Sequence, residues 1–320
     1  MRSGWKDVLT AIFMGMILPG MMLNFMVMLL DHRDPGVEPQ QSVPQEQSFL
    51  PMRLKQSDGT VEEKDMDAYL VGVVLAEMPA SFEPEALKAQ AVAARTYTQK
   101  AYTTGGKHGD GSVCTDSACC QAYISEADYL AQGGTEEGLE KIRSAVTATS
   151  GYVLTYGGEL IEATYFSCSG GSTEDAAAVW GVDFPYLQAV ASPGEEHAAY
   201  YTDTVTFTPK QFQAALGAAL PGTPKSWFGT TTFTEGGGVA AMTIGGQSYT
   251  GTQLRSLLGL RSTAFTVSCG EDVISITTQG YGHRVGMSQY GADAMAVTGS
   301  TYAEILAHYY PGTELSKIQP

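Results

Sequence analysis

The pattern of hydrophobic and polar positions divides the chain into an apolar N-terminal segment, a polar connection and a large mixed domain. Residues 8–30 carry no charged side chain, and an apolar run of this length is typical of a helix that spans a bilayer. Arg2 and Lys6 precede it, which predicts a short tail inside and the remainder outside. A cleaved signal peptide is the alternative, but no small-residue cleavage motif follows. We therefore expect a retained membrane anchor over residues 1–30 and a single-pass protein of the cell membrane.

The connection that follows, residues 31–50, is polar and rich in proline. It offers little apolar surface to bury, so we expect an extended linker.

Residues 51–320 alternate between helical and strand periodicity. A helix is predicted from Asp65 or Asp67 to about Glu77, and a second from Pro84 to about Tyr102. The many alanines of the second helix predict close packing against its neighbours. Further helices are predicted at 125–130, 136–147, 209–220, 252–258, 289–297 and 301–310.

Short strands are predicted between these helices, at 53–61, 151–166 and within 204–277, where turn residues separate apolar runs. The class is therefore α+β, with short-stranded sheets, helices and a smaller strand-rich subdomain at about 200–275.

Composition and charge narrow the partners of this domain. The 320-residue chain carries a net charge of -16 and 43% hydrophobic residues. Nucleic acids and anionic lipid surfaces are bound mainly through lysine and arginine, so neither is an expected partner. A neutral or weakly charged ligand fits better.

Glu77 is the most informative single residue. It falls in the last turn of the first helix, on the same face as apolar Leu70, Val73 and Val74. Burial and the negative end of the helix dipole both raise the pKa of a carboxyl group, which suits a general acid at neutral pH. A structural ion pair is the alternative. Lys88 and Arg95 lie on one face of the next helix, either facing Glu77 or as ordinary helix charges.

Two further segments carry candidate ligand-binding residues. In ATYFSCSGGSTE, residues 163–174, a strand runs into a turn whose Ser167, Ser169 and Thr173 can bond a sugar or stabilise the turn itself. The nucleophile-elbow pattern of serine hydrolases is absent. In QGYGHRVGMSQYGADAMA, residues 279–296, a glycine-rich loop enters a helix, and His283 and Gln289 can reach the same cleft.

A cluster of soft ligands lies in KHGDGSVCTDSACCQAY. His108, Cys114, Cys119 and Cys120 supply four ligands, the number that a structural zinc site needs. A disulfide from Cys114 to Cys119 or Cys120 is the alternative. We favour zinc, with the choice between Cys119 and Cys120 as the ligand left open. Cys168 and Cys269 are interpreted as ordinary buried thiols.

The chain resembles the stage II sporulation protein D family over most of residues 55–311. The segments YLVGVVLAEMP, FEPEALKAQAVAARTY, FSCSGGSTE, LRSLLGLRST and GYGHRVGMSQYGADAMA occur in the family's order. The resemblance implies a peptidoglycan lytic transglycosylase, a carbon–oxygen lyase that cuts the β-1,4 bond between N-acetylmuramic acid and N-acetylglucosamine and leaves 1,6-anhydro ends. The expected substrate is glycan stripped of stem peptides. The expected setting is engulfment of the forespore, at the mother-cell membrane of the sporulation septum, with stage II sporulation proteins P and M.

The resemblance also assigns roles to residues. Glu77 matches the catalytic acid, with Lys88 and Arg95 orienting it or stabilising charge near the scissile bond. Arg284 stands where the family usually has glycine, which implies a changed groove shape or charge. The residues implied to line the glycan groove are Tyr165, Ser167, Ser169, His283 and Gln289.

Two other functions compete with this one. Relatives of the family act as amidase modifiers, so a non-catalytic wall-binding activator of an amidase is the main alternative. A zinc hydrolase built on His108 is disfavoured, because cysteine-rich sites rarely keep an open position for water.

Overall fold

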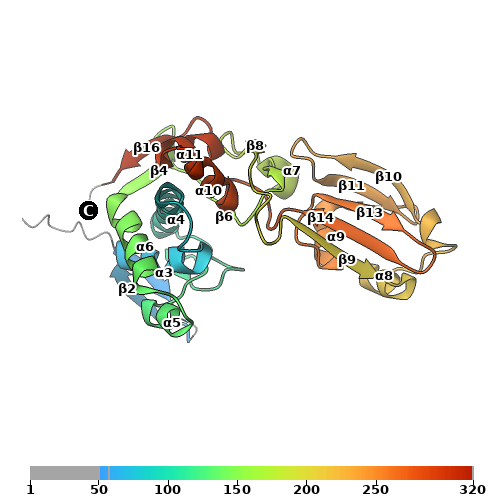
Figure 1. Cartoon of the computed structure of the whole chain (residues 1–320), viewed down its shortest axis with the longest axis horizontal. Helices are drawn as coiled ribbons and strands as arrows, with labels where there is room; N and C mark the ends of the chain where they lie inside the picture. Colours follow the sequence, from blue (N-terminus) through green and yellow to red (C-terminus); the bar gives the residue numbers. More distant parts are fainter. Residues whose placement is uncertain (1–50, 57, 319–320) are drawn as a thin grey trace, which may run out of the picture. The chain divides into compact units, whose positions relative to one another are not determined.

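The structure, a computed structural model, describes residues 51–56 and 58–318 (Figure 1). Within them helices and short strands are mixed, as predicted. The predicted anchor and linker, residues 1–50, lie outside the described residues. The α-helices are α3 (Met66–Glu77), α4 (Pro84–Thr104), α5 (Glu126–Ala131), α6 (Glu136–Ala148), α7 (Ala176–Trp180), α8 (Pro209–Leu216), α9 (Gly251–Leu258), α10 (Gln289–Val297) and α11 (Tyr302–Tyr309), and Pro224–Ser226 form a 3-10 helix.

The strands form small sheets rather than one continuous sheet. Four of these sheets have three strands, in the orders β2-β1-β3, β16-β4-β5, β10-β11-β12 and β13-β14-β9. The pairs β15-β6 and β7-β8 complete the set. The strands are β1 (Pro51–Lys55), β2 (Val61–Asp65), β3 (Ser112–Cys114), β4 (Tyr152–Tyr156), β5 (Glu159–Leu160), β6 (Tyr165–Phe166), β7 (Gly171–Ser172), β8 (Ala191–Ser192), β9 (Thr202–Phe207), β10 (Phe228–Phe233), β11 (Val239–Ile244), β12 (Gln247–Thr250), β13 (Phe265–Cys269), β14 (Ile274–Gln279), β15 (Met287–Ser288) and β16 (Glu314–Lys317).

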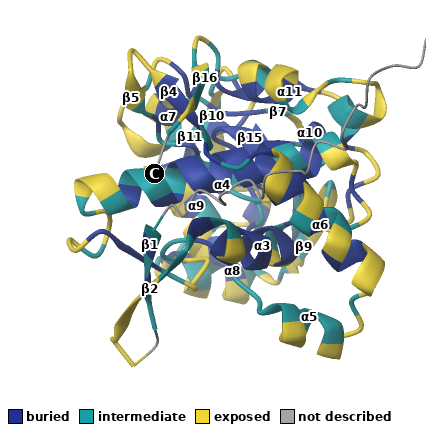
Figure 2. Ribbon diagram, turned by 90° about the vertical axis from the view of Figure 1, so that its left-hand side faces the viewer, coloured by how far each residue is buried: buried dark blue, intermediate teal, exposed yellow. Residues whose placement is uncertain are grey.

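Helix α4 is the centre of the larger hydrophobic core. It contacts α3, α6, α10 and α11, and most of its length is buried in Figure 2. Ala86, Ala89 and Ala93 are fully inaccessible to solvent, because side chains this small let the neighbouring helices approach closely. The prediction of a closely packed, alanine-rich helix is confirmed. The helix ends at Gly105, whose φ of 87° is left-handed, as is common just past helix ends.

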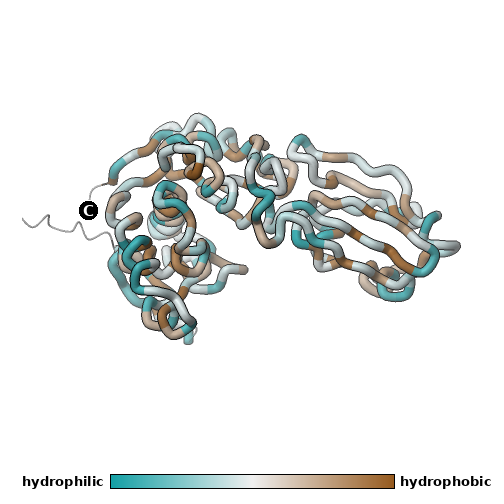
Figure 3. Tube along the Cα trace, viewed as in Figure 1, coloured by the Kyte–Doolittle hydropathy of each residue, from teal (hydrophilic) through white to brown (hydrophobic). Residues whose placement is uncertain are grey.

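A second hydrophobic cluster is built from the part of the sequence that runs from β9 to β14. Most residues of the larger core come from other parts of the sequence. Phe212 of α8, Leu254 of α9 and Ile276 of β14 are completely buried in it. Figure 3 shows polar and apolar positions alternating along these strands, as expected for sheets with one buried face. The described residues nevertheless belong to one compact unit, so a separate subdomain at about 200–275 stays a prediction.

The predicted single-pass membrane location is contradicted within the part of the chain that the structure describes. None of the helices between residues 51 and 318 is long and apolar enough to cross a membrane. The segment 8–30, on which the prediction rested, lies outside these residues.

Candidate active site and metal centre

Glu77 is the last residue of α3 and lies partly buried between two hydrogen-bond donors. The helix ends there because Met78 adopts an extended backbone, the conformation favoured before Pro79. The Ala122 N–H donates to Glu77 Oε1 at 3.0 Å, and Gln289 Nε2 donates to Oε2 at 3.1 Å. Burial raises the pKa of Glu77, although both hydrogen bonds act in the opposite direction. The predicted raised pKa of this carboxyl group is thus borne out, with burial as its cause.

The wall opposite Glu77 is built by pairing two segments that are far apart in the sequence. Strand β6 runs parallel to β15, with Tyr165 opposite Met287. Beyond it, Cys168 and Tyr281 exchange two backbone hydrogen bonds of 3.1 and 2.7 Å. Gly282, with φ of 121°, is required here, since a Cβ atom would come within 2.7 Å of Phe166. The pairing brings the hydroxyl-rich turn and the glycine-rich loop to one side of the carboxylate.

A cavity of about 620 Å³ opens in front of Glu77. It brings together Glu77 and four of the five residues predicted to line a glycan groove: Tyr165, Ser167, His283 and Gln289. Two aromatic side chains at its margin, Trp180 and Tyr281, are 40% and 37% exposed. The cavity therefore combines one perturbed carboxyl group, neutral polar groups and apolar rings, as ligand sites commonly do.

Gln121 is a residue of this cavity that the sequence did not indicate. Its Oε1 accepts a hydrogen bond of 2.8 Å from the Tyr165 hydroxyl, and its Nε2 donates to Thr98 Oγ1 at 2.9 Å. The contact fixes the Tyr165 ring against α4. Nothing local in the sequence marks Gln121, because its partners lie in distant segments.

His283 is held as a neutral side chain. Burial, and after it the positive charge of Arg255, lower the pKa of His283 to about 4. Nδ1 accepts a hydrogen bond of 3.1 Å from the Val285 N–H, so the neutral tautomer carries its proton on Nε2. The ring lies between Phe166 and Trp180, with centroid distances of 5.5 and 5.3 Å. At neutral pH it offers a donor without adding charge.

Ser169 does not line the cavity, contrary to the prediction. Its side chain is fully buried, and its Oγ donates to Glu195 Oε1 at 2.8 Å. Glu195 also accepts from the Ser169 N–H and the Cys168 thiol. Strand β6 ends at Phe166, and the chain beyond it directs Ser169 into this buried network. Cys168 is buried, as expected.

Lys88 and Arg95 do not face Glu77, and that prediction is wrong. Lys88 pairs with Glu85, at 2.6 Å. Arg95 is fully buried and pairs with Asp67 at 2.9 Å, in the first turn of α3. Its Nη1 also donates to the Thr149 carbonyl at 2.7 Å, so the cation caps the C-terminus of α6.

Arg284 lies in the interior rather than in the groove. Its φ of 65° is left-handed, a conformation that glycine adopts without strain. The guanidinium pairs with Glu174 at 3.1 Å and donates to the carbonyls of Ser169, Ser172 and Gly236. The expectation of altered charge in the groove is therefore wrong: the arginine ties this loop to the turn between β10 and β11.

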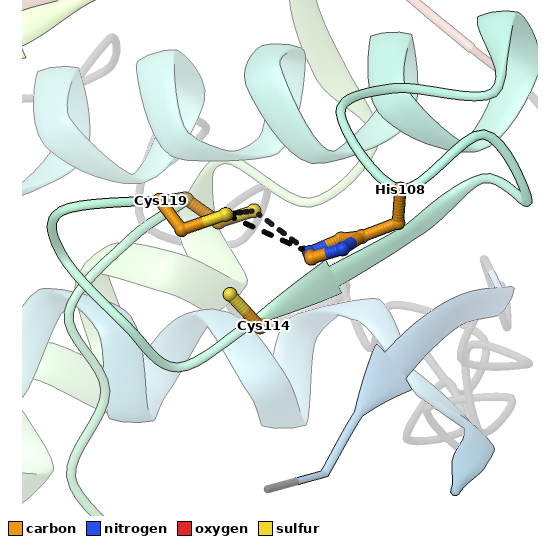
Figure 4. A group of neighbouring side chains, drawn as sticks. His108, Cys114 and Cys119 are labelled. Atoms are coloured by element: carbon orange, nitrogen blue, oxygen red, sulfur yellow. Dashed lines mark hydrogen bonds between the residues drawn. The ribbon is translucent and has the colours of Figure 1, made fainter. Parts of the chain in front are cut away.

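His108 and the three neighbouring cysteines form one compact cluster (Figure 4). Their ligand atoms all lie within 4.8 Å of one another. His108 Nε2 is 3.8 Å from Cys119 Sγ and 3.5 Å from Cys120 Sγ, and the two sulfur atoms are 3.8 Å apart. All five cysteines are free, so the alternative of a disulfide from Cys114 is not met.

These separations fit a tetrahedral metal site. Zinc–sulfur bonds of about 2.3 Å at tetrahedral angles place two sulfur atoms about 3.8 Å apart. Both adjacent cysteines can therefore contribute, together with His108 and Cys114, and the cluster can hold a metal ion. The same loop reaches the active site, because Ala122, the donor to Glu77, follows Cys120 by two positions.

Two charged residues at the cavity were also missed. Lys107 and Glu162 line it, and Glu162 forms an ion pair of 2.9 Å with Lys100. The sequence carries no local signal for either, since a single charged residue next to a turn is ordinary on a protein surface.

The sequence matches known proteins over most of the residues that form this site. A family model described as stage II sporulation protein matches residues 55–156, which include Glu77 and the whole metal cluster. Stage II sporulation protein D of Bacillus subtilis (strain 168) is 43% identical over 263 residues, 81% of this chain and 76% of that protein. The chain belongs to the stage II sporulation protein D family.

Two other relatives show the range of the family. Stage II sporulation protein D of Bacillus amyloliquefaciens is 41% identical over 266 residues, covering 82% of this chain and 77% of that protein. A protein of Bacillus subtilis (strain 168) named amidase enhancer is 30% identical over 306 residues, covering 77% of this chain and 40% of that protein. The stage II sporulation protein D family is thus related to a protein named for its effect on an amidase.

Proposed function

We propose that the protein is a peptidoglycan lytic transglycosylase that acts on glycan strands stripped of stem peptides during engulfment in sporulation. The observation that carries the proposal is the position of Glu77. A carboxyl group whose pKa is raised by burial lies at the wall of a cavity of about 620 Å³. Raised carboxyl pKa values are what general acid catalysis at neutral pH requires.

In the proposed reaction Glu77 serves first as acid and then as base. The protonated carboxyl group donates its proton to the glycosidic oxygen while the bond from that oxygen to C1 of the muramoyl residue breaks. The C6 hydroxyl oxygen of the same residue then bonds to C1, and the Glu77 carboxylate takes the hydroxyl proton. The carboxyl group is restored, no water is consumed, and the product has a 1,6-anhydro end.

This chemistry needs one carboxyl group, whereas most glycoside hydrolases use two. Glu162 also lines the cavity, but it is held in an ion pair with Lys100, and no described residue gives Glu77 such a partner. Gln289 holds Glu77 from the other side and leaves it free to exchange a proton.

The other cavity residues suit an uncharged sugar. His283 is neutral at physiological pH, and the exposed rings of Trp180 and Tyr281 offer apolar faces to a sugar ring. The net charge of -16 does not oppose binding, since stripped glycan carries few charges besides its lactyl carboxylates.

The proposal is tested with the full chain alone on peptidoglycan from which an amidase has removed the stem peptides. Soluble glycan fragments are expected. Sporulation proteins P and M are the proposed partners, and the P protein, as an amidase and endopeptidase, would supply the stripped strands. If the amidase must act before this protein, intact peptide-bearing wall should release no fragments.

The similarity to an amidase enhancer favours one second candidate, a wall-binding activator of a partner amidase. In that case the protein releases nothing from stripped glycan by itself. It would instead raise the turnover of the amidase on intact wall, and a Glu77→Gln variant would do so equally well.

We further propose that His108, Cys114, Cys119 and Cys120 hold a structural zinc ion. All four ligands come from the protein, which leaves no position for a reactive water, so the ion's chemistry is to fix the loop. That loop carries the Ala122 N–H against Glu77. The donor spacing supports this role over a hydrolytic one.

Removal of the metal is expected to lower stability and activity together. Chelation of the purified protein should lower the unfolding temperature by about 5–10 °C, from the loss of a few kcal/mol, and should reduce cleavage because Ala122 is no longer fixed. Metal analysis and circular dichroism with and without chelator measure both effects. Cys269→Ser, which changes a cysteine outside the cluster, is the control. Absence of bound metal in protein with reduced cysteines would contradict the proposal.

Glu77 is also expected to make stability depend on pH. A carboxyl group whose pKa is higher in the folded state binds more protons there, so its contribution weakens the fold as pH rises from its unfolded pKa through its folded pKa. Glu77→Gln should therefore unfold at a higher temperature than the parent at pH 7, with a difference that shrinks as the pH is lowered toward 4. A constant difference across this range would show that Glu77 does not titrate as described.

A further inference from the structure

A second cavity, of about 690 Å³, adjoins the one in front of Glu77. Tyr281 lines both cavities, and the Gly282 N–H donates to the Arg261 carbonyl at 3.1 Å. The two cavities therefore meet at the glycine-rich loop. A glycan strand that crosses the first cavity can continue into the second.

Two arginine side chains line this second cavity, Arg255 from α9 and Arg261 from the turn after it. Their presence is unusual in a chain with 18 basic and 34 acidic residues. Arg261 is fixed in place: its guanidinium carbon lies 3.9 Å from the centroid of Tyr200 and 4.9 Å from that of Tyr281. Its Nε donates to Asp203 at 3.0 Å, so this ion pair does not occupy the two terminal nitrogens.

Arg255 is the cation that lacks a counter-charge. It is partly buried, and its side chain makes no ion pair or hydrogen bond with any residue in 51–56 or 58–318. A guanidinium removed in part from water without a partner is unfavourable, unless a ligand supplies the anion. Its charge reaches the first cavity, where it helps to keep His283 neutral.

We propose that Arg255, supported by Arg261, forms a carboxylate-binding subsite of the glycan groove, which takes the lactyl carboxylate of a muramoyl residue beyond the one cleaved at Glu77. The inference rests on the proposed function for the identity of the strand. The planar guanidinium matches a carboxylate with two parallel hydrogen bonds. In stripped glycan the lactyl carboxylate is free, whereas in peptide-bearing glycan it is an amide. The subsite would therefore favour stripped strands.

The proposal is tested by binding rather than cleavage, in the full chain carrying Glu77→Gln so that the ligand is not consumed. The probe is a defined glycan of alternating N-acetylglucosamine and N-acetylmuramic acid, measured by calorimetry. A second probe has its lactyl carboxylates converted to methylamides. Adding Arg255→Gln should weaken binding of the first probe about tenfold, the effect of one charged hydrogen-bonded contact, and leave binding of the second unchanged.

The controls separate this subsite from general effects. Arg143→Gln removes a half-buried arginine that pairs with Glu126 and lines neither cavity, and should change neither affinity. Arg255→Lys, which keeps the charge but not the planar fork, should bind the carboxylate probe with intermediate affinity.

Four other results of these binding measurements would each contradict part of the proposal. Equal affinities of Arg255→Gln and its parent for the carboxylate probe would overturn the subsite while leaving the proposed function intact. Equal weakening for both probes would show that Arg255 shapes the groove without binding a carboxylate. Tighter binding of peptide-bearing glycan through Arg255 would assign the subsite to a peptide carboxylate instead. No binding of either probe by the parent would contradict the proposed function together with the subsite.

Discussion

Glu77→Gln should reduce kcat/KM on stripped glycan by about a thousandfold, the range of a lost general acid–base group. The fold should persist, because the amide oxygen can still accept the Ala122 N–H and α3 ends as before. Initial rates of fragment release, with circular dichroism to confirm folding, measure the effect. The loss should appear in kcat, because Glu77 acts on the glycosidic oxygen in the transition state rather than holding the ground-state sugar.

Glu162→Gln is the matched control, since it changes the other carboxylate of the same cavity in the same way. Its effect should stay below about tenfold, because Glu162 is engaged in an ion pair with Lys100 rather than placed as the catalytic acid. If the two variants lost activity equally, the site would be using a pair of carboxyl groups, and the single-acid mechanism would be wrong.

Arg95→Ala should lower the free energy of unfolding by about 3–5 kcal/mol, the cost of removing one member of a buried ion pair. Arg95 is fully inaccessible to solvent and holds Asp67 of α3 together with the carbonyls that end α6. Its loss leaves a cavity and several unpaired acceptors. Chemical denaturation of the variant measures the change.

Activity per folded molecule should change little in Arg95→Ala, because its contacts do not include Glu77. Lys88→Ala is the comparison: Lys88 forms a partly exposed pair with Glu85 and should cost less than about 1 kcal/mol. A folded, stable Arg95→Ala protein without activity would restore the catalytic role that the family resemblance implied.

The helices of this protein could be predicted because their signals are local. The helix predicted from Asp65 or Asp67 is capped by Asp65, whose side chain accepts from the Ala68 N–H. Ser288 caps α10 in the same way, at the start of the helix predicted at 289–297. Pro84 and Gly105 delimit α4. A cap needs only residues within a turn of each other, so a single sequence contains the information.

The partners of charged side chains could not be predicted, because they are set by distant segments. Helical spacing indicated that Lys88 and Arg95 share a face but could not identify the partner of Arg95, which is Asp67 rather than Glu77. Ser169 was expected to line the groove, yet its hydroxyl donates to Glu195 in the interior. Arg284 occupies a left-handed position, and its buried partner Glu174 comes from more than a hundred residues earlier.

The active site was predictable where residue type and local position were enough. Glu77 stood out as an acid at the end of an apolar helix, and the metal cluster as four soft ligands in one loop. Gln121, Ala122 and Glu162 were missed, because their roles depend on the pairing of β6 with β15 and on the path of the metal-binding loop.

Digestion of stripped peptidoglycan in water labelled with oxygen-18 tests whether the protein cleaves glycan without adding water. We expect fragments that are lighter by one water molecule than the hydrolysis products and that carry no label in the new muramoyl end. Labelled reducing ends would show that water attacks C1 and would contradict the mechanism assigned to Glu77. No fragments from well-folded protein would contradict enzymatic cleavage itself and would favour the amidase activator.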